Sequence, residues 1–486
     1  MKQKLTLKQW CKKAEELEIA LSKQYWKLET GQKYSKPKIK KYETKINKLA
    51  EYFLKNFDRP EILKDTCIGA VASTKTFQLS LKFKEERNKK IRSKKHTIKG
   101  NPVTWDTWRQ YVTKATHNER KKIYDKFIKL TPLISPIIKE KFQKNKQIYK
   151  QYGTTPLKLY VKEHELTTKE LIKIITTLRN QVKKPFQKQF KYYAKKLLHK
   201  KPEYYDDLYY VRNAIYQDMT KDFRGVDPIK HIKKTMKEMG LKPDKIRVDK
   251  KDRPKKYASP FCMAIKIPQD IRISFKPENP LNDANSIYHE MGHAIHFSSI
   301  KPQLPYWTRT IISNGLAETF STFFEGILTD YDYMTEELKL DPKYSKEIIR
   351  RKNFMQLFGA AFYTGNSLFR IAYWRENLKF ENCNKRYAKE LKKSMGMKIP
   401  GAYWQLHHIL PESMMYVPSY MLAEIQQNKI KTQLRKKYGK RWWKSKKAGK
   451  EVLNLMSKGT DSEAGDFSKL TKKDILNYVR SITTNP

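Results

Sequence analysis

Two histidines and a glutamate form the most chemically informative stretch of this sequence. His289 and His293 lie four residues apart, and Glu290 directly follows the first of them. On an α-helix four residues make about one turn, so both imidazoles project from one face. Two nitrogen ligands in this arrangement suit one zinc ion. Glu290, turned by roughly 100° around the helix, can reach a water at the metal without binding the metal. This H-E-x-x-H spacing is typical of zinc peptidases.

The motif requires a helix, and its surroundings predict one. Residues 285–297 contain no proline and a single internal glycine, and Asp283 or Asn285 is placed to cap the N-terminus. His296 falls three residues after the motif, and we interpret it as a structural histidine. Another His-Glu pair, His164 and Glu165, has no histidine four residues beyond it, and we assign it to a solvated face. The alternative for the motif itself is a pair of structural histidines.

A catalytic zinc needs a third protein ligand, with the fourth position left to water. The four cysteines stand alone and far apart, so they are poor candidates. Glu318 is the better one, because the 25 residues that separate it from His293 suffice to end one helix, cross a loop and bring back a second helix. Prolines and an Asn-Gly pair mark that loop. The alternative is an ordinary first-turn glutamate that the helix dipole stabilises.

Glu325 lies two helical turns beyond Glu318 and therefore on the same helix face. A carboxylate at this position can accept a hydrogen bond from a ligand histidine and orient its ring. Ser321 and Thr322 compete for that task. The alternative for Glu325 is a solvated side chain.

These segments together resemble a known family. The stretch HEMGHAIH at 289–296, followed by GLAETFSTFFE at 315–325, is similar to the thimet oligopeptidase and oligoendopeptidase F family of zinc metallopeptidases. The resemblance extends from about residue 205 to 480 and includes 252–262 and 416–424. It implies a mainly α, two-lobed fold with a deep central cleft, one zinc ion, and hydrolysis of peptide bonds in oligopeptides. Residues 416–420 also resemble zinc carboxypeptidases, so an endopeptidase and a carboxypeptidase both stay open.

The resemblance also implies substrate-contacting residues late in the chain. It carries over Tyr420 and His408 as catalytic residues, with Tyr416 and His407 as alternative substrate-binding residues. Amide hydrolysis builds negative charge on the former carbonyl oxygen, and a phenol or imidazole N–H aimed at that oxygen stabilises it. The two tyrosines are four residues apart, although Pro418 between them predicts a helix start or a kink. The alternative is that they are packing residues with solvated hydroxyls.

Helices are expected over most of the chain, because glycine is scarce and amphipathic segments are long. Short alternating segments at 245–249, 264–267 and 271–275 predict a small antiparallel sheet just before the zinc helix. The exposed edge of such a sheet can hold an extended peptide by main-chain hydrogen bonds. A composition shift near residue 240 predicts an N-terminal helical lobe at 1–240 and a catalytic lobe at 241–486.

The chain is strongly basic, with 103 Lys and Arg residues against 50 Asp and Glu residues and a net charge of +53. Such a charge suggests nucleic acid as a partner, and a nucleic-acid-binding protein with a non-catalytic zinc is one alternative function. Three windows, 277–300, 310–337 and 399–428, contain no lysine or arginine, and they hold all the candidate site residues. We therefore expect nucleic acid to bind only weakly, through charge.

Nothing in the sequence predicts insertion into a membrane. The first residues lack the apolar core of a signal peptide, and no apolar run approaches the ~18–20 residues that span a bilayer. Scattered, unpaired cysteines agree with a reducing compartment. A cytoplasmic enzyme is the expectation, and the sequence does not predict its oligomeric state.

A carboxypeptidase would also need a cation for the substrate's terminal carboxylate, for which Arg370 and Arg375 are candidates.

Overall fold

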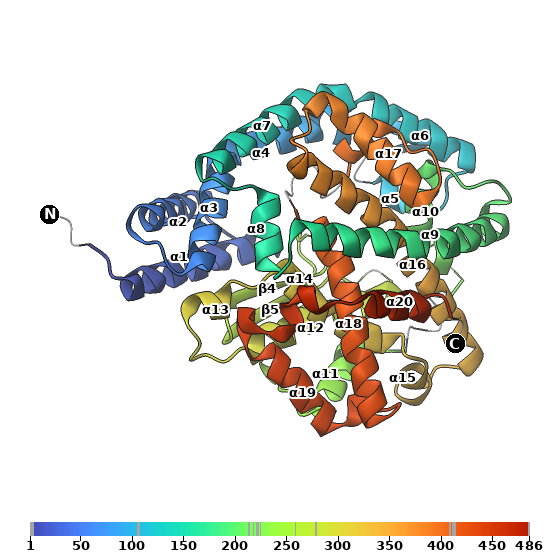
Figure 1. The fold of residues 1–486 in the computed structure, drawn as a ribbon. Coiled ribbons are helices and arrows are strands. Elements are labelled where there is room, and N and C mark those ends of the chain that lie inside the picture. The colour runs from blue at the N-terminus through green and yellow to red at the C-terminus, as the bar shows by residue number, and fades with distance from the viewer. Residues whose placement is uncertain are drawn as a thin grey trace.

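Helices dominate the computed structural model, as expected for a mainly α protein (Figure 1). The structure describes residues 4–104, 107–211, 214–216, 218–219, 223, 225–257, 259–277, 279–407, 410 and 415–484. The helices before residue 240 are α1 (Leu7–Glu29), α2 (Lys36–Asn56), α3 (Glu61–Lys75), α4 (Phe77–Arg87), α5 (Trp108–Tyr111), α6 (His117–Lys129), α7 (Ser135–Gln151), α8 (Pro156–Glu163), α9 (Thr168–Leu198), α10 (Asp207–Val211) and α11 (Pro228–Glu238).

The later part of the chain carries the helices that hold the candidate site. They are α12 (Pro280–Ser299), α13 (Tyr306–Thr310), α14 (Asn314–Leu328), α15 (Tyr331–Glu336), α16 (Pro342–Arg375), α17 (Cys383–Met395), α18 (Val417–Tyr438), α19 (Lys446–Met456) and α20 (Lys472–Ser481). No helix among the described residues is long and apolar enough to cross a membrane.

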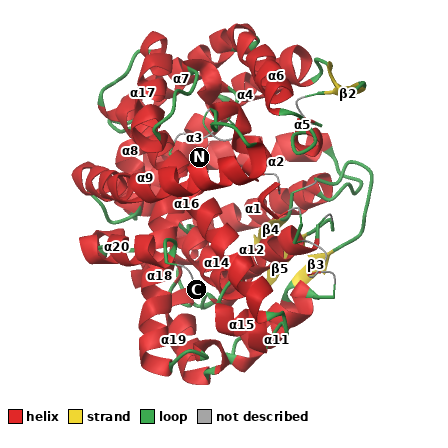
Figure 2. Cartoon of the chain, turned by 90° about the vertical axis from the view of Figure 1, so that its right-hand side faces the viewer, coloured by secondary structure: helices red, strands yellow, loops and turns green. Residues whose placement is uncertain are grey.

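The sheet beside α12 is mixed rather than purely antiparallel (Figure 2). It has three strands, β3 (Arg247–Asp249), β4 (Phe261–Lys266) and β5 (Asp270–Ser274), in the order β3-β5-β4. β4 and β5 pair antiparallel as predicted, whereas β3 pairs parallel to β5. The long 250–260 connection between β3 and β4 returns the chain to the opposite edge of β5 and permits this arrangement. A separate hairpin of β1 (His96–Ile98) and β2 (Asn101–Val103) lies far earlier in the chain.

Helix α9 shows why these segments fold as helices. Thr167 and Glu170 form a reciprocal capping box at its start. Its buried residues recur at three- and four-residue intervals, as the core face of an amphipathic helix requires. This face packs against α16 and α20. The expected surface position of His164, just before α9, is wrong: its side chain is fully buried.

The hydrophobic core extends across residue 240. One cluster of buried side chains runs from Phe83 to Ile482 and joins helices from both parts of the chain. In Figures 1 and 2, α17 lies at the same end of the molecule as α6 and α7, although it comes much later in the sequence. The boundary near residue 240 and the deep cleft stay predictions.

Buried His296 gives a test of this core. Burial lowers the pKa of His296 to about 3, whereas the unfolded chain has an ordinary histidine pKa near 6.5. The unfolded state therefore binds more protons below pH 6.5, and stability is lost as the pH falls. We expect His296→Leu to make the fall in unfolding free energy between pH 6.5 and 4.5 shallower, by up to about 1.4 kcal/mol per pH unit.

Urea denaturation at several pH values measures this slope. His199→Asn is the matched control, because His199 is exposed and has a left-handed backbone that asparagine tolerates. An undiminished slope in His296→Leu would contradict the assignment of His296 as a buried neutral histidine.

Candidate metal centre

Helix α12 presents the two histidines of the motif on one face. It begins earlier than predicted: Asn279 caps it by accepting a hydrogen bond from the Asn282 N–H at 3.2 Å, and Asp283 accepts one from the Asn279 N–H. The expectation that Asp283 or Asn285 is the cap is therefore wrong by one turn, because Pro280 takes the first helical position. The ring centroids of His289 and His293 are 4.9 Å apart.

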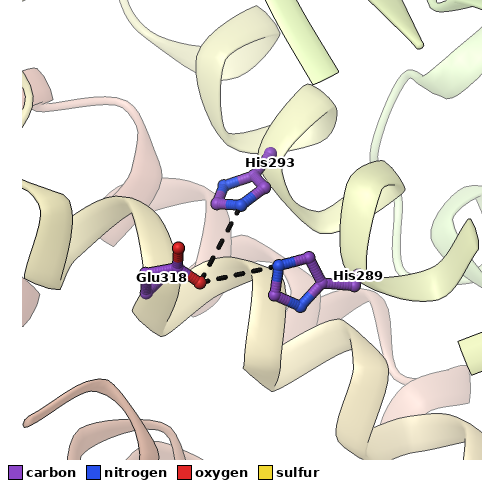
Figure 3. A group of neighbouring side chains, drawn as sticks. All are labelled: His289, His293 and Glu318. Atoms are coloured by element: carbon purple, nitrogen blue, oxygen red, sulfur yellow. Dashed lines mark ion pairs between the residues drawn. The ribbon is translucent and has the colours of Figure 1, made fainter. Parts of the chain in front are cut away.

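Helix α14 brings Glu318 to the same place. Ser313 caps this helix, and the side chain of Glu318 is 5% exposed. Its Oε2 lies 3.5 Å from His289 Nε2 and 4.0 Å from His293 Nε2 (Figure 3). A tetrahedral zinc with ligands at about 2.0–2.1 Å separates its ligand atoms by roughly 3.3 Å. Two imidazole nitrogens and one carboxylate oxygen that converge to these distances fit such an ion.

A glycine lets the two ligand helices approach each other closely. A Cβ on Gly292 would lie 2.6 Å from the Phe320 carbonyl oxygen and 2.7 Å from the Ser321 Cα. Any side chain at this position would push the backbones apart. The glycine within the motif is therefore a packing requirement of the helix crossing that delivers Glu318.

Glu290 lies between the metal group and the sheet. Burial raises its pKa, while the positive charge of His289 and a hydrogen bond from the Cys262 backbone lower it in part. Cys262 belongs to β4, the outer strand of the sheet on this side. A partly buried carboxylate with a raised pKa is suited to accept and return a proton.

Glu325 hydrogen-bonds the ring of His289. Glu325 Oε2 lies 3.0 Å from His289 Nδ1, which leaves Nε2 facing Glu318. Burial alone would raise the pKa of Glu325, but Lys352 and His289 outweigh it and lower the pKa to about 2. Lys352, on α16, forms an ion pair with Glu325 and also donates to Asn285.

The two ligand histidines differ in charge before a metal binds. Burial lowers the pKa of His289, but the hydrogen bond to Glu325 and the surrounding carboxylates raise it to about 9. Burial and the neighbouring His289 hold the pKa of His293 well below the usual range. A cation binding at this group would therefore displace one proton from His289.

Three of the four substrate-contacting candidates late in the chain lie within the described residues. Tyr416 donates a hydrogen bond to Glu318 Oε1 at 2.5 Å, so it contacts the third ligand directly. Tyr420 lies beside it, with ring centroids 5.3 Å apart, and packs on Tyr363. His407 is buried: its Nδ1 accepts from the Leu410 N–H and its ring stacks on Phe362. His408 lies outside the described residues.

Sequence reasoning missed Lys352 and the hydrogen bonds that Ser321 and Thr322 make to Glu318. Lys352 is one of 103 basic residues and has no distinguishing pattern, so only the fold reveals it. Ser321, considered for orienting a histidine, instead donates to Glu318 Oε2 at 3.2 Å. Thr322 bonds the main-chain oxygen of Glu318.

Comparison with solved structures gives a fold relationship. The structure titled PZ peptidase A with inhibitor 2 superposes on 98% of this chain and 86% of its own, with a TM-score of 0.61 and 15% sequence identity. The two chains share one fold. No protein-family model matches the sequence, and no curated protein matches it. At this identity the comparison concerns the fold, and the chemistry rests on the side chains described above.

The helix crossing can be tested at Gly292. We expect Gly292→Ala to force α12 and α14 apart, to destabilise the protein by about 1–3 kcal/mol, and to weaken zinc binding. Gly326→Ala is the matched control on α14, because a Cβ there meets nothing closer than 3.6 Å. It should stabilise the helix by about 0.5–1 kcal/mol. Chelator competition and thermal denaturation report the two effects, and unchanged zinc affinity in Gly292→Ala would contradict this account of the crossing.

Proposed function

We propose that this protein is a zinc-dependent endopeptidase that hydrolyses peptide bonds of oligopeptides. The observation that carries the proposal is the convergence of His289, His293 and Glu318 beside the partly buried carboxylate of Glu290. The shared fold with PZ peptidase A supports it. A zinc ion held by these three residues would polarise the scissile carbonyl and make a water more acidic.

The residues of the chain perform the proton transfers. Glu290 takes a proton from the attacking water and then passes it to the leaving nitrogen. Its raised pKa favours the second step, because burial makes the carboxylate hold a proton more readily than an exposed glutamate does. Glu325 and Lys352 hold the ring of His289 in place throughout.

Tyr420 is our choice for stabilising the negative charge on the former carbonyl oxygen. The hydroxyl of Tyr416 bonds the carboxylate of Glu318, whereas the hydroxyl of Tyr420 bonds Tyr416 and, among the described residues, no carboxylate. Burial raises the pKa of Tyr420, and the charges of Glu318 and Glu290 add to this, so both carboxylates are near it. His408 is the second candidate by family resemblance alone. Tyr416 instead orients the third ligand.

The sheet offers a place for the substrate backbone. In an extended strand the N–H and C=O of one residue point the same way, and the Cys262 backbone bonds to Glu290. The Cys262 carbonyl therefore also faces the side of Glu290. A peptide that adds to this strand would place its main chain next to the general base, largely independent of its side chains.

Glu290→Gln tests the chemistry. The variant retains all three metal ligands, so we expect zinc content near one per chain with a loss of at least about 10²–10⁴-fold in turnover. His289→Ala should lose both zinc and activity. Glu85→Gln, on an exposed helix face, should behave as the wild type. Metal analysis and cleavage of a quenched fluorescent peptide measure these outcomes. Full activity in Glu290→Gln would contradict the proposed mechanism.

A carboxypeptidase is the alternative activity, since it uses the same metal chemistry. It requires a cation for the terminal carboxylate, and neither arginine candidate is well placed. Arg370 is buried among aromatic rings and donates to the Leu410 carbonyl. Arg375 is half exposed and pairs with Glu376. These partners favour the endopeptidase.

Peptides with modified ends separate the two activities. We expect a peptide amidated at its C-terminus and acetylated at its N-terminus to be cut internally at a rate within about threefold of the free peptide, because backbone recognition needs neither terminus. Mass spectrometry of the products identifies the cut bond. Release of single C-terminal residues only, with the amidated peptide left intact, would favour the carboxypeptidase.

We also propose a cytoplasmic enzyme that binds nucleic acid only weakly. The four cysteines, which are all free, support a cytoplasmic location. Weak binding of nucleic acid follows from a net charge of +53 without a concentrated basic motif. Such binding would fall steeply with salt. It would leave the metal chemistry unchanged.

A further inference from the structure

Helix α8 ends at a fully buried histidine whose ring joins two helices. His164 Nδ1 lies 2.7 Å from the Tyr160 carbonyl oxygen, and Nε2 lies 3.1 Å from the Gly315 nitrogen. A carbonyl oxygen only accepts and a backbone N–H only donates. The ring is therefore neutral, with its proton on Nδ1. Burial lowers its pKa to about 4, which keeps it neutral at physiological pH.

The partner of His164 stands in the first turn of α14. The first N–H groups of a helix have no acceptor within the helix. Ser313 accepts from Leu316, and His164 accepts from Gly315. A Cβ on Gly315 would lie 2.6 Å from His164 Cδ2, so the contact between ring and backbone is tight. Glu318 follows three residues later, about one turn along the same helix.

The neighbouring Tyr160 reaches the start of a second helix. Its ring stacks on His164 with centroids 4.1 Å apart. Its hydroxyl lies 3.0 Å from Ser419 Oγ, and both groups are buried. Ser419 stands in the first turn of α18, between Tyr416 and Tyr420. The end of α8 and the residue that follows it therefore contact the starts of α14 and α18, two of the helices at the metal group. Figure 1 shows where these three helices lie.

We propose that His164 and Tyr160 are positioning residues of the metal centre, with His164 setting the place of Glu318 and Tyr160 setting the place of Tyr416 and Tyr420. The inference rests on the proposed function in taking the group as a zinc site. It assigns a task to residues that precede the catalytic motif by more than 120 positions. Both side chains are buried, so each acts through the helix that it holds.

His164→Phe is the first test. Phenylalanine fills the space and can stack on Tyr160, but it leaves the Gly315 N–H without an acceptor. We expect the dissociation constant for zinc to rise about tenfold or more, as for other residues that orient metal ligands. His164→Gln restores an acceptor near Nε2, so its zinc affinity should return to within about threefold of wild type. His96→Phe, a histidine that packs on Phe127 away from the site, is the control.

Tyr160→Phe should act differently, because it loses only the bond to Ser419. We expect zinc affinity within about twofold of wild type and a fall in kcat of about tenfold, a typical loss when a group that orients a ligand is removed. Tyr210→Phe is the matched control: the Tyr210 hydroxyl is buried with no hydrogen-bond partner among the described residues. It should change neither quantity.

For His164, the zinc dissociation constant, measured on full-length protein by chelator competition, decides between positioning and mere stability. A purely structural role would lower the melting temperature of zinc-free His164→Phe while leaving its zinc affinity unchanged, and that result would overturn the role of His164. An unchanged kcat in Tyr160→Phe would overturn the role of Tyr160. If His164→Phe does not fold, Gly315→Ala disturbs the same contact from α14 and is expected to give the same loss of zinc affinity. A wild type that binds no zinc would instead overturn the proposed function itself.

Discussion

The candidate site depends on the close crossing of α12 and α14. Two of the candidate ligands come from one helix and the third from another, so the distance between the helix backbones sets the spacing of the three side chains. Gly292 permits that distance, because a single Cβ would meet the Phe320 oxygen at 2.6 Å. The crossing lies between His289 and His293 on one helix and one turn beyond Glu318 on the other. Interiors pack densely, so a shift at this point moves the ligand by a comparable amount.

Electrostatics divides the carboxylates around the histidines into separate roles. Burial raises the pKa of Glu290, whereas Lys352 and His289 lower that of Glu325 to about 2. One carboxylate thus holds a proton more readily than an exposed glutamate, and the other stays ionised and hydrogen-bonds the ring of His289. Pairs of acidic groups with opposed pKa shifts are a general means of assigning acid–base and electrostatic tasks. The difference arises because Glu325 pairs with Lys352 on α16 and hydrogen-bonds His289.

The sequence predicted the parts of the site that helical geometry relates. His289 and His293 are one turn apart, and Glu325 is two turns from Glu318, so spacing alone placed them on common faces. Glu318 was predicted as the third ligand because a catalytic zinc needs three protein ligands. No comparable spacing rule relates residues in distant segments, which is why Lys352 was missed and His164 was assigned to the surface. The parallel pairing of β3 likewise depends on how a long connection returns, and alternation of residues does not reveal it.

Charge balance explains why a strongly basic chain keeps lysine and arginine out of these segments. Helix α14 is almost wholly buried, and an unpaired cation there would be costly to desolvate. Around the histidines lie the carboxylates of Glu290, Glu318 and Glu325, and the ammonium of Lys352 pairs with Glu325. With neutral imidazoles, the three carboxylates and the one ammonium sum to two negative charges. A divalent cation would neutralise both charges, whereas a second lysine would neutralise only one. Before the cation arrives, the proton on His289 supplies part of that balance. Burial accounts for the absence of lysine and arginine from α14, and the three carboxylates near the histidines fit the divalent cation that we propose for this site.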